Sequence, residues 1–340
     1  MKVGILGVAH MQAESYTKVF ANEKISVVGV YDRNTLRGTQ FAKKLAIPFF
    51  QSMENILNTD IDTVLICSEN SLHYDYTLAA AFHNKHVIIE KPLALKVDDA
   101  LRMMLTCEEF RVKLLVAHPM RFSKTIIDLK TVFDSGQLGQ ILALNGTNHG
   151  KNPGGWFLNR ELSGGGAIID HMIHLIDLSN WLFHFKIQSI YARKKGNLVS
   201  DIEDAGLIHI EFTNGSFMSL DTSWNRPLNY PVWGDAALEI ITDRGQLYVD
   251  GFGRKAELYH HDSHYDYKLF EKDPDVEMIQ TFIRCIDKNE PLPVTGEDAL
   301  YTVKIANLAY TSIQQNRTIY QHEFEEILRT PFYLQRTPTM

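Results

Sequence analysis

The chain has 340 residues, of which 45% are hydrophobic and 22% are charged. It is longer than one typical domain and rich enough in apolar residues for sizeable cores, so we expect two globular domains. The formal net charge of -7 argues against a nucleic-acid or anionic-membrane partner. The three scattered cysteines include no CxxC pair and indicate core thiols rather than disulfides or a metal site. There is no signal-peptide pattern and no 18-residue apolar stretch, so the sequence predicts a cytoplasmic protein.

Short apolar runs alternate with helical patterns over residues 1–122. This alternation predicts right-handed β–α–β units, an α/β domain and one parallel, doubly wound sheet. The expected strands are 1–9, 25–31, 62–67, 85–89 and 113–117, and the expected helices are 10–21, 39–45, 72–84 and 97–110. Ligands of such sheets bind at the carboxyl ends of the strands, so the residues that follow each strand are candidates for a site.

The turn after the first strand reads GVAHMQ from Gly7 onward. A Rossmann dinucleotide-binding turn has the pattern G-x-G-x-x-G, which lets backbone amides and a helix N-terminus meet a pyrophosphate. Here Gly7 keeps the first glycine, whereas Ala9 and Gln12 replace the other two. Asp32 ends the second strand, where a carboxylate binds the adenosine ribose, although an aspartate there can also simply start a turn. Together these features favour a Rossmann dinucleotide-binding domain.

Asp32 and Arg33 bear on which dinucleotide would bind. A carboxylate at this position repels a 2′-phosphate, so Asp32 favours NAD over NADP. The guanidinium of Arg33 can stack on adenine or pair with a phosphate, and this keeps NADP as the alternative.

Glu90, Lys91 and Pro92 follow the expected strand 85–89. A lysine at the carboxyl end of a parallel strand, followed by proline, is held in an extended conformation that directs it toward the ligand crevice. The competing interpretation is a solvated surface lysine. The proline and the position after the strand favour a site residue.

Residues 163–181, SGGGAIIDHMIHLIDLSNW, combine three glycines with an apolar helical pattern. Asp170, His174 and Asp177 are spaced i, i+4 and i+7, so they share one narrow arc of the expected helix. Burying such groups is costly unless they are paired or used. One interpretation is a buried Asp–His pair that braces the fold, and the other is a catalytic face that a ligand or backbone approaches over the glycines. We favour the second because the glycines and the polar arc occur together.

Beyond residue 122 the pattern predicts an α+β domain over 123–323 with a large, mostly antiparallel open sheet, followed by a peripheral tail over 324–340. The expected strands are 140–146, 187–194, 205–212, 216–223, 236–242, 246–250 and 255–260, and the expected helices are 123–134, 276–287 and 297–316. Open sheets with an apolar outer face usually pack on a second copy, so we expect a homodimer or homotetramer through this sheet.

These features resemble the Gfo/Idh/MocA oxidoreductases, the family of glucose–fructose oxidoreductase and inositol 2-dehydrogenase. The resemblance covers nearly the whole chain, and its most specific part is the combination of E-K-P at Glu90, the glycine triplet, and D-x-x-x-H at Asp170 and His174. The other matching residues are Gly7, Asp32 with Arg33, SENSLH at 68–73 (against T-P-N-x-x-H), Arg121 with Phe122, GQLG at 136–139, and Trp156. The sequence departs from the family in the lost G-x-G-x-x-G and in Met172, where many members carry glycine.

The resemblance implies that residues 1–122 bind NAD(P) and that 123–323 bind a sugar, inositol or related polyol and mediate oligomerisation. It makes Lys91, Asp170 and His174 the catalytic group. The candidate cofactor-binding residues are Gly7, Ala9, His10, Met11, Asp32, Arg33, Ser68, Asn70, His73, Glu90 and Lys91. The candidate substrate residues are His118, Arg121, His149, Trp156, Asp170 and His174. We expect no metal, because the carboxylates and histidines near Asp170 lack the closed ligand set of a structural site.

Oxidation of a secondary alcohol needs a base for the hydroxyl proton and a hydride acceptor. His174 suits the base because imidazole titrates near neutrality, and the Lys91 ammonium would then hydrogen-bond the same oxygen. Lys91 is the alternative base if burial and Asp170 tune its pKa, and Asp170 would orient His174 or bind a neighbouring hydroxyl. Two other functions stay open. One is a redox-neutral lyase or glycosidase-type reaction with retained NAD, and the other is a non-catalytic ligand-binding or regulatory role, which the altered glycine turn suggests.

Overall fold

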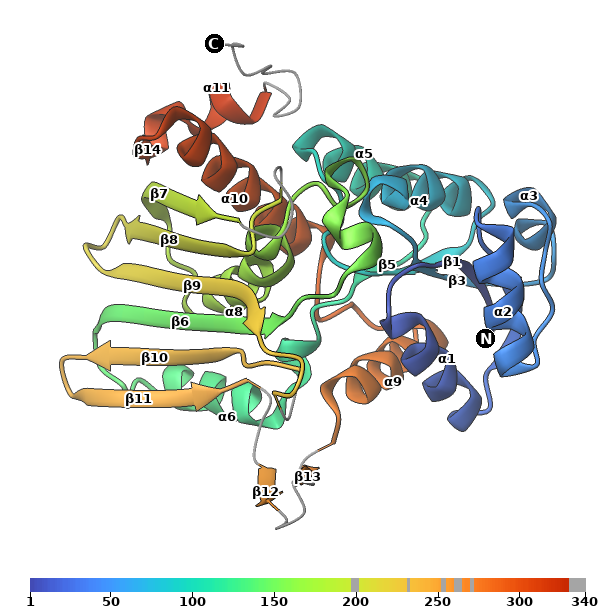
Figure 1. Cartoon of the computed structure of the whole chain (residues 1–340), viewed down its shortest axis with the longest axis horizontal. Coiled ribbons are helices and arrows are strands. Elements are labelled where there is room, and N and C mark those ends of the chain that lie inside the picture. The colour runs from blue at the N-terminus through green and yellow to red at the C-terminus, as the bar shows by residue number, and fades with distance from the viewer. Residues whose placement is uncertain (197–201, 231–232, 252–254, 260–264, 270–271, 330–340) are drawn as a thin grey trace. The chain divides into compact units, whose positions relative to one another are not determined.

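A computed structural model describes residues 1–196, 202–230, 233–251, 255–259, 265–269 and 272–329 (Figure 1). The chain divides into two compact units, the first of which contains residues 1–117, 161–164 and 275–300. The remaining described residues form the second unit. The expected division into 1–122, 123–323 and 324–340 is linear along the chain, whereas these two units are not. The first unit includes residues 161–164 and 275–300, which pack with the N-terminal residues.

Among the described residues, the first unit holds a five-stranded sheet in the order β2-β1-β3-β4-β5, with every pair parallel. This confirms the expected parallel Rossmann sheet, because apolar runs such as TVLIC in β3 are buried along their whole length. The strands are β1 Lys2–Val8, β2 Ser26–Tyr31, β3 Thr63–Cys67, β4 His86–Ile89 and β5 Leu114–Val116. β1 pairs with β2 on one side and β3 on the other, so the strand order reverses beside β1, and a ligand crevice is expected at its carboxyl end.

The helices of this unit are α1 Gln12–Asn22, α2 Thr35–Leu45, α3 Met53–Leu57, α4 His73–Phe82, α5 Val97–Glu109 and α9 Pro274–Asp287. The expectation for α2 was wrong at its start, which lies at Thr35 rather than residue 39. The Asn34 side chain accepts a hydrogen bond from the Arg37 amide at 3.1 Å and caps this earlier start. The three cysteines, Cys67, Cys107 and Cys285, are free and buried, as the sequence predicts.

The second unit holds a seven-stranded sheet in the order β11-β10-β6-β9-β8-β7-β14, counted over the described residues. Its described neighbours pair antiparallel except for β6 and β9, which confirms a mostly antiparallel open sheet. Its strands are β6 Ile141–Lys151, β7 Ile187–Lys195, β8 Ala205–Phe212, β9 Phe217–Arg226, β10 Ala237–Thr242, β11 Gly245–Asp250 and β14 Ile319–Tyr320. A separate two-stranded sheet pairs β12 Lys255–Tyr259 with β13 Tyr265–Leu269.

β6 is longer than the sequence predicts, because it continues from residue 146 to Lys151. The added residues have weak strand propensity, but β9 pairs with them as far as Lys151 and β10 pairs with Thr147, and this pairing holds them extended. Residues alternate between the two faces of a strand, and the buried members of this extension are Asn148 and Gly150. The side chain of His149 therefore points to the opposite face of the sheet.

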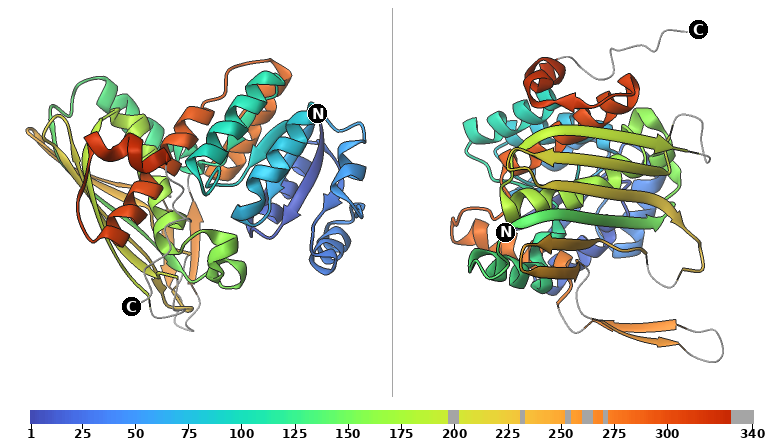
Figure 2. Two further views of the ribbon diagram at one scale, coloured as in Figure 1. Left: turned by 90° about the horizontal axis from the view of Figure 1, so that it is seen from above. Right: turned by 90° about the vertical axis from the view of Figure 1, so that its left-hand side faces the viewer.

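Helices cover one face of this sheet, with α6 (Lys124–Asp134) against β11 and α8 (Ile173–Phe183) against β6. The right-hand view of Figure 2 shows the other face of the sheet, which no described helix covers. The exposed large hydrophobic side chains on the strands of this sheet are Leu142, Leu207, Phe217, Tyr248 and Tyr320. The remaining helices are α7 Arg160–Ser163, α10 Gly296–Gln315 and α11 Phe324–Arg329, and 3-10 turns cover Asn70–Leu72, Pro119–Phe122, Gly155–Leu158 and Gln321–Glu323.

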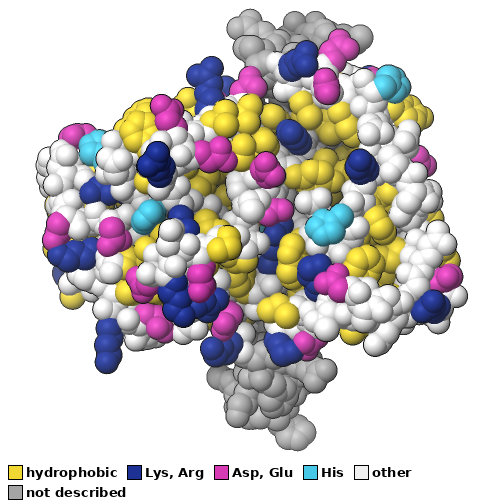
Figure 3. Space-filling view, turned by 180° about the vertical axis from the view of Figure 1, so that it is seen from behind, with side chains coloured by type: hydrophobic (Ala, Val, Ile, Leu, Met, Phe, Trp, Pro, Cys, Tyr) yellow, Lys and Arg dark blue, Asp and Glu magenta, His cyan; other side chains and the backbone are white. Residues whose placement is uncertain are grey.

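Over the face drawn in Figure 3, lysine and arginine side chains are interspersed with aspartate and glutamate. None of the helices in the described part of the chain combines the length and apolar content needed to span a bilayer.

Candidate functional site

The turn after β1 is tight, and it requires glycine at its first position. Gly7 has a φ of +80°, and a Cβ atom there would lie 2.5 Å from the Cβ of Ser68. His10 then closes the turn, because its amide donates to the Cys67 carbonyl at 2.9 Å and its Nδ1 accepts from the Gln12 amide at 3.3 Å. Helix α1 consequently starts at Gln12 rather than residue 10, and the exposed Met11 precedes it. The turn keeps the tight geometry of a dinucleotide-binding loop although two of the three glycines are lost.

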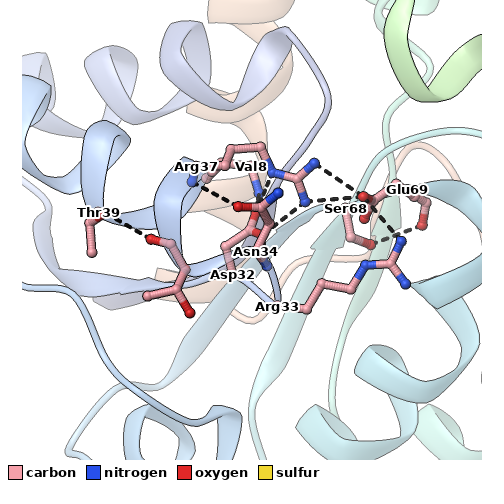
Figure 4. A network of polar contacts seen from close by, with 9 residues as sticks. Val8, Asp32, Arg33, Asn34, Arg37, Thr39, Ser68 and Glu69 are labelled. Carbon is pink, nitrogen blue, oxygen red and sulfur yellow. Dashed lines mark hydrogen bonds and ion pairs between the residues drawn. The ribbon is translucent and has the colours of Figure 1, made fainter.

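Asp32, at the end of β2, is completely enclosed by this chain (Figure 4). Its Oδ2 accepts hydrogen bonds from the Val8 amide at 2.8 Å and from Arg37 Nε at 2.9 Å. Its Oδ1 accepts from the Asn34 amide at 2.7 Å and from Arg37 Nη2 at 2.8 Å. A carboxylate offers about four lone-pair positions, so these donors fill all of them.

Glu69 lies beside this pair and was not among the predicted site residues. Its Oε1 lies 3.1 Å from both Nη1 and Nη2 of Arg37 and 3.3 Å from Nη2 of Arg33 (Figure 4). The residue is only 3% exposed, and its Oε2 has no hydrogen-bond partner among the described residues. Sequence analysis also missed Arg37, five positions after Asp32. A signal for Glu69 existed, because it stands where the family pattern T-P-N-x-x-H has proline.

The predicted residues Ser68, Asn70 and His73 are buried around the carboxyl end of β3. The Ser68 hydroxyl donates to the Glu69 carbonyl at 3.1 Å, and Asn70 Nδ2 donates to the Ser163 carbonyl at 2.9 Å. His73 Nδ1 lies 2.8 Å from the Pro92 carbonyl, a distance at which the ring N–H donates to that oxygen. Complete burial lowers the pKa of His73 to about 4, so this imidazole is neutral near pH 7.

Lys91, which the sequence places after β4, is buried to 8% exposure and is not a solvated surface lysine. Its amide donates to Oε2 of the neighbouring Glu90 at 3.1 Å, and the hydrogen bond between His73 and Pro92 holds the next residue. Glu90 is 2% exposed, and its Oε1 lies 3.6 Å from Nδ1 of His10. The first unit thus gathers His10, Glu90 and Lys91 at the carboxyl edge of its sheet.

Two features of this edge of the sheet are compatible with a bound dinucleotide. The tight turn at Gly7 leads directly into helix α1, which provides the helix N-terminus that a pyrophosphate needs. The second observation is the buried acceptor Oε2 of Glu69, which an adenosine hydroxyl could satisfy.

In the second unit, the glycines before α8 are required by contacts within the chain. A Cβ atom at Gly165 would lie 1.9 Å from the Tyr310 hydroxyl, and one at Gly166 would lie 1.9 Å from the Glu203 carbonyl oxygen. The Glu203 carboxylate is 1% exposed and accepts from the Gly166 amide at 2.8 Å, the Ile168 amide at 3.3 Å and the Tyr310 hydroxyl at 2.6 Å. The groups that approach these glycines closely are therefore Tyr310 and Glu203 of this chain. Neither residue was among the predicted site residues.

The apolar pattern that follows the glycines forms a helix in the structure, as the sequence predicts. It opens as a π-helical turn, Ile168–Met172, that continues into α8. Such wide turns often occur at functional sites, and they change the rotation between successive side chains. The expected apolar residues are all buried, namely Ile168, Ile169, Met172, Ile173, Leu175 and Ile176.

The three polar side chains of this segment, Asp170, His174 and Asp177, have different surroundings. Asp170 Oδ2 accepts from the Trp224 indole at 3.0 Å and lies 3.3 Å from Nε2 of His171. His171 Nδ1 lies 2.8 Å from the Asn148 carbonyl, and this fixes the ring beside Asp170. His174, one turn further along, is partly exposed. Asp170 is therefore held in place by two aromatic rings while its side chain keeps 12% exposure.

Asp177 belongs to a buried ion pair with Arg121. Arg121 Nε donates to Asp177 Oδ2 at 2.8 Å and Nη2 donates to Oδ1 at 2.6 Å, while His118 Nδ1 lies 3.7 Å from Oδ2. The guanidinium also lies 5.6 Å from the centre of the Trp181 ring. Arg121 is 4% exposed and His118 is 1% exposed, so these two predicted substrate residues belong to a buried cluster of charged and polar side chains around Asp177.

The other two predicted substrate residues are separated by the sheet. His149 lies on the face opposite to Asn148, between Asp221 at 3.2 Å and Asp235 at 3.3 Å. The Asp235 carboxylate raises the pKa of His149, and this outweighs its partial burial. Trp156 stacks on Phe157 with a centroid distance of 3.9 Å and packs against the cluster that contains Trp224, the partner of Asp170.

No group of three or more histidine, cysteine, aspartate or glutamate side chains within the described residues is arranged to hold a metal ion.

Two family models match the chain. One, described as an oxidoreductase family with an NAD-binding Rossmann fold, matches residues 1–118, and the other, a GFO/IDH/MocA C-terminal domain, matches residues 126–248. The protein therefore belongs to the GFO/IDH/MocA family of oxidoreductases, and its N-terminal residues match the NAD-binding Rossmann domain of that family.

Among its relatives, the chain is similar to a myo-inositol 2-dehydrogenase of Thermotoga maritima, with 24% identity over 96% of this chain and 100% of the relative. It is also similar to a 2,7-anhydro-N-acetylneuraminate hydratase of Escherichia coli, with 26% identity over 67% of this chain and 62% of the relative. A solved structure of scyllo-inositol dehydrogenase from Lactobacillus casei with bound NAD(H) and scyllo-inositol has the same fold. Its TM-score is 0.78 at 19% identity, covering 94% of this chain and 98% of that one.

Proposed function

We propose that the protein is an NAD-dependent dehydrogenase that transfers a hydride between the nicotinamide and a secondary alcohol of a sugar, inositol or related polyol. Membership of the GFO/IDH/MocA family and the relative named for myo-inositol support this substrate class. The carboxylates of Asp32 and Glu69, where the adenosine ribose would bind, support NAD over NADP because negative charge there disfavours a 2′-phosphate.

The observation that carries the proposal is the burial of Lys91 at the carboxyl edge of the parallel sheet. Keeping an ammonium at 8% exposure is costly unless it is paired or used. The position after β4 is where ligands of such sheets bind. The burial of this lysine where ligands bind therefore supports a role in the reaction rather than that of a surface lysine that only contacts solvent.

Lys91, Asp170 and His174 are the proposed catalytic group. A bound nicotinamide supplies the hydride acceptor. His174 takes the hydroxyl proton, because it is partly exposed and imidazole titrates near neutrality. The Lys91 ammonium donates a hydrogen bond to the same oxygen and stabilises the developing alkoxide. Asp170, which Trp224 and His171 hold in place, orients His174 or accepts from a neighbouring hydroxyl. The alternative assignment makes Lys91 the base.

The test is an absorbance assay for NADH, at about 340 nm where reduced nicotinamide absorbs, over a panel of inositols, sugars and polyols. Lys91→Met and His174→Gln are expected to lower kcat by about 10²–10⁴-fold, the usual contribution of a general acid–base group. Lys96→Met and His83→Gln are matched controls at sites outside the proposed group and are expected to keep full activity. Full activity in both Lys91→Met and His174→Gln would contradict this assignment.

A redox-neutral reaction with retained NAD, of the lyase or glycosidase type, is the second candidate. The relative named as a hydratase favours it. Product formation without accumulation of free NADH would support this reaction, whereas stoichiometric NADH supports the dehydrogenase. Nucleotide binding with no turnover over the whole panel would instead indicate a ligand-binding or regulatory role.

We also propose that the open sheet of the second unit forms a homodimer or homotetramer. Its uncovered face carries Leu207 at 59% exposure and Tyr248 at 69%, and apolar side chains of this kind favour contact with a second copy. Leu207→Glu is expected to shift the light-scattering mass toward the monomer, and the exposed Leu36→Glu in the first unit is the control. A monomeric wild-type chain would refute this proposal. The cytoplasmic location stays a prediction of the sequence.

A further inference from the structure

Asp32 holds the position where a carboxylate would meet an adenosine ribose, yet its acceptor capacity is used up. Two backbone amides and two nitrogens of Arg37 fill the approximately four lone-pair positions of the carboxylate. Its side chain is 0% exposed. A ribose hydroxyl would have to displace one of these donors to bind Asp32.

Glu69 has the capacity that Asp32 lacks. Both contacts with Arg37 and the contact with Arg33 involve Oε1, which leaves Oε2 without a hydrogen-bond partner among the described residues. A buried carboxylate oxygen without a donor is costly, and such groups usually have a ligand or a functional reason. The neighbouring Arg33 side chain is 40% exposed and long, so it can shift to admit a nucleotide while its guanidinium stays paired with Oε1 of Glu69.

The charges of the four side chains balance. Arg33 and Arg37 carry two positive charges, and Asp32 and Glu69 carry two negative charges within hydrogen-bond or ion-pair distance of them. Arg37 stays charged, because the two carboxylates raise its pKa although burial opposes this. Neither guanidinium is therefore available to a 2′-phosphate without giving up a carboxylate.

We propose that Glu69 is the nucleotide-selecting residue of this protein. Its Oε2 accepts a hydrogen bond from a hydroxyl of the adenosine ribose, and its charge withholds Arg33 and Arg37 from a 2′-phosphate. Asp32 is then a positioning residue that acts through Arg37. This inference rests on the proposed NAD-dependent function and adds to it a residue at the place where the family pattern has proline.

The test compares the full chain with Glu69→Gln by titration calorimetry with NAD+ and NADP+. The amide oxygen of glutamine can stay with the arginines, so its NH2 group replaces the accepting Oε2 with a donor and removes the charge. The ratio of the two Kd values is expected to shift toward NADP+ by about 10–100-fold, the usual effect of a hydrogen bond to a charged group. Glu54→Gln, at an exposed site on α3, is the matched control and is expected to leave the ratio unchanged.

A second measurement uses NAD+ analogues that lack the 2′- or the 3′-hydroxyl of the adenosine ribose. The wild-type chain is expected to bind one of them about tenfold more weakly than NAD+, and Glu69→Gln is expected to lose nothing further with that analogue. This readout does not depend on turnover, and its wild-type arm does not depend on the variant folding.

The outcomes separate the two proposals. A wild-type chain that binds NAD+ but shows no loss with either analogue, or a folded Glu69→Gln with an unchanged Kd ratio, overturns the role of Glu69 and leaves the dehydrogenase standing. A wild-type chain that binds neither NAD+ nor NADP+ overturns the proposed function itself.

Discussion

Each unit contains an arginine whose Nε and Nη2 both donate to a single carboxylate, and the two pairs have nearly the same geometry. We call such a two-point ion pair a fork. Arg37 donates to Asp32 through Nε and Nη2 at 2.9 and 2.8 Å, and Arg121 donates to Asp177 through Nε and Nη2 at 2.8 and 2.6 Å. Arg37 keeps 28% side-chain exposure and reaches Glu69, whereas Arg121 keeps 3% and lies near Trp181. An arginine–carboxylate ion pair alone therefore does not indicate a ligand site. Exposure and a neighbouring unused acceptor distinguish the fork that can select a ligand from the fork that braces a helix.

The largest effect on stability is expected from Arg121→Met. The substitution leaves the Asp177 carboxylate buried without its main partner, and breaking a buried pair costs about 3–5 kcal/mol. Urea unfolding measures this loss as a lower free energy of unfolding. The double variant Arg121→Met/Asp177→Leu removes both charges and is expected to recover most of it. A loss below about 1 kcal/mol in the single variant would contradict the bracing role.

His73, in the first unit, is expected to make stability fall on acidification. Its pKa in the folded chain is about 4 against an ordinary value of 6.5, so the unfolded chain binds the proton first. The stabilisation is present above 6.5 and is lost as the pH falls toward 4, up to about 3 kcal/mol at about 1.4 kcal/mol per pKa unit. Unfolding curves of wild type and His73→Gln should converge as the pH falls through this range, and His83→Gln should not show this. A pH-independent difference would refute the assignment.

Arg37→Met is expected to cost about 1–2 kcal/mol, less than its counterpart at Arg121, because Asp32 keeps the amides of Val8 and Asn34. The two substitutions are matched, so the difference between their unfolding free energies tests the comparison directly. Equal losses would show that the exposed fork braces the fold as strongly as the buried one.

The smallest effect is expected at His149, in the second unit, and it has the opposite sign to His73. The Asp235 carboxylate, aided by Asp221, raises the pKa of His149 above 6.5 in the folded chain. The stabilisation is therefore complete below 6.5 and is lost as the pH rises through the raised value. Because the pair is only partly buried, we expect less than about 1 kcal/mol. His149→Asn should flatten this alkaline slope in urea unfolding, and an unchanged slope would exclude the pair as its source.

The fold could be predicted from the sequence because its signals are local. Apolar runs such as TVLIC, each followed by a helical pattern, specify buried parallel strands, and the structure has them in that order. The later strands were predicted from successive runs separated by hairpin-type turns, but the end of β6 was missed. Its polar residues are extended because β9 pairs with them, and this long-range pairing leaves no local signal.

A site residue could be predicted only where its place in a single helix or strand was enough to identify it. Lys91 follows a strand and is buried there, and Asp170 lies on an apolar helix, so both could be located from the pattern. Arg37 and Glu69 are 32 residues apart, and they become neighbours only because the fold places β2 and β3 on either side of β1. The role of His149 depends on which face of β6 it occupies, and the strand's true length decides that.

Glu203 has a consequence for how the chain reaches its native state during synthesis. One carboxylate joins the glycines before α8 to a hydroxyl on Tyr310, more than a hundred positions further along the polypeptide. A ribosome-bound fragment that stops short of this tyrosine lacks one of the donors that hold the carboxylate. The hydrogen bond from this hydroxyl to Glu203 can therefore form only after Tyr310 has emerged.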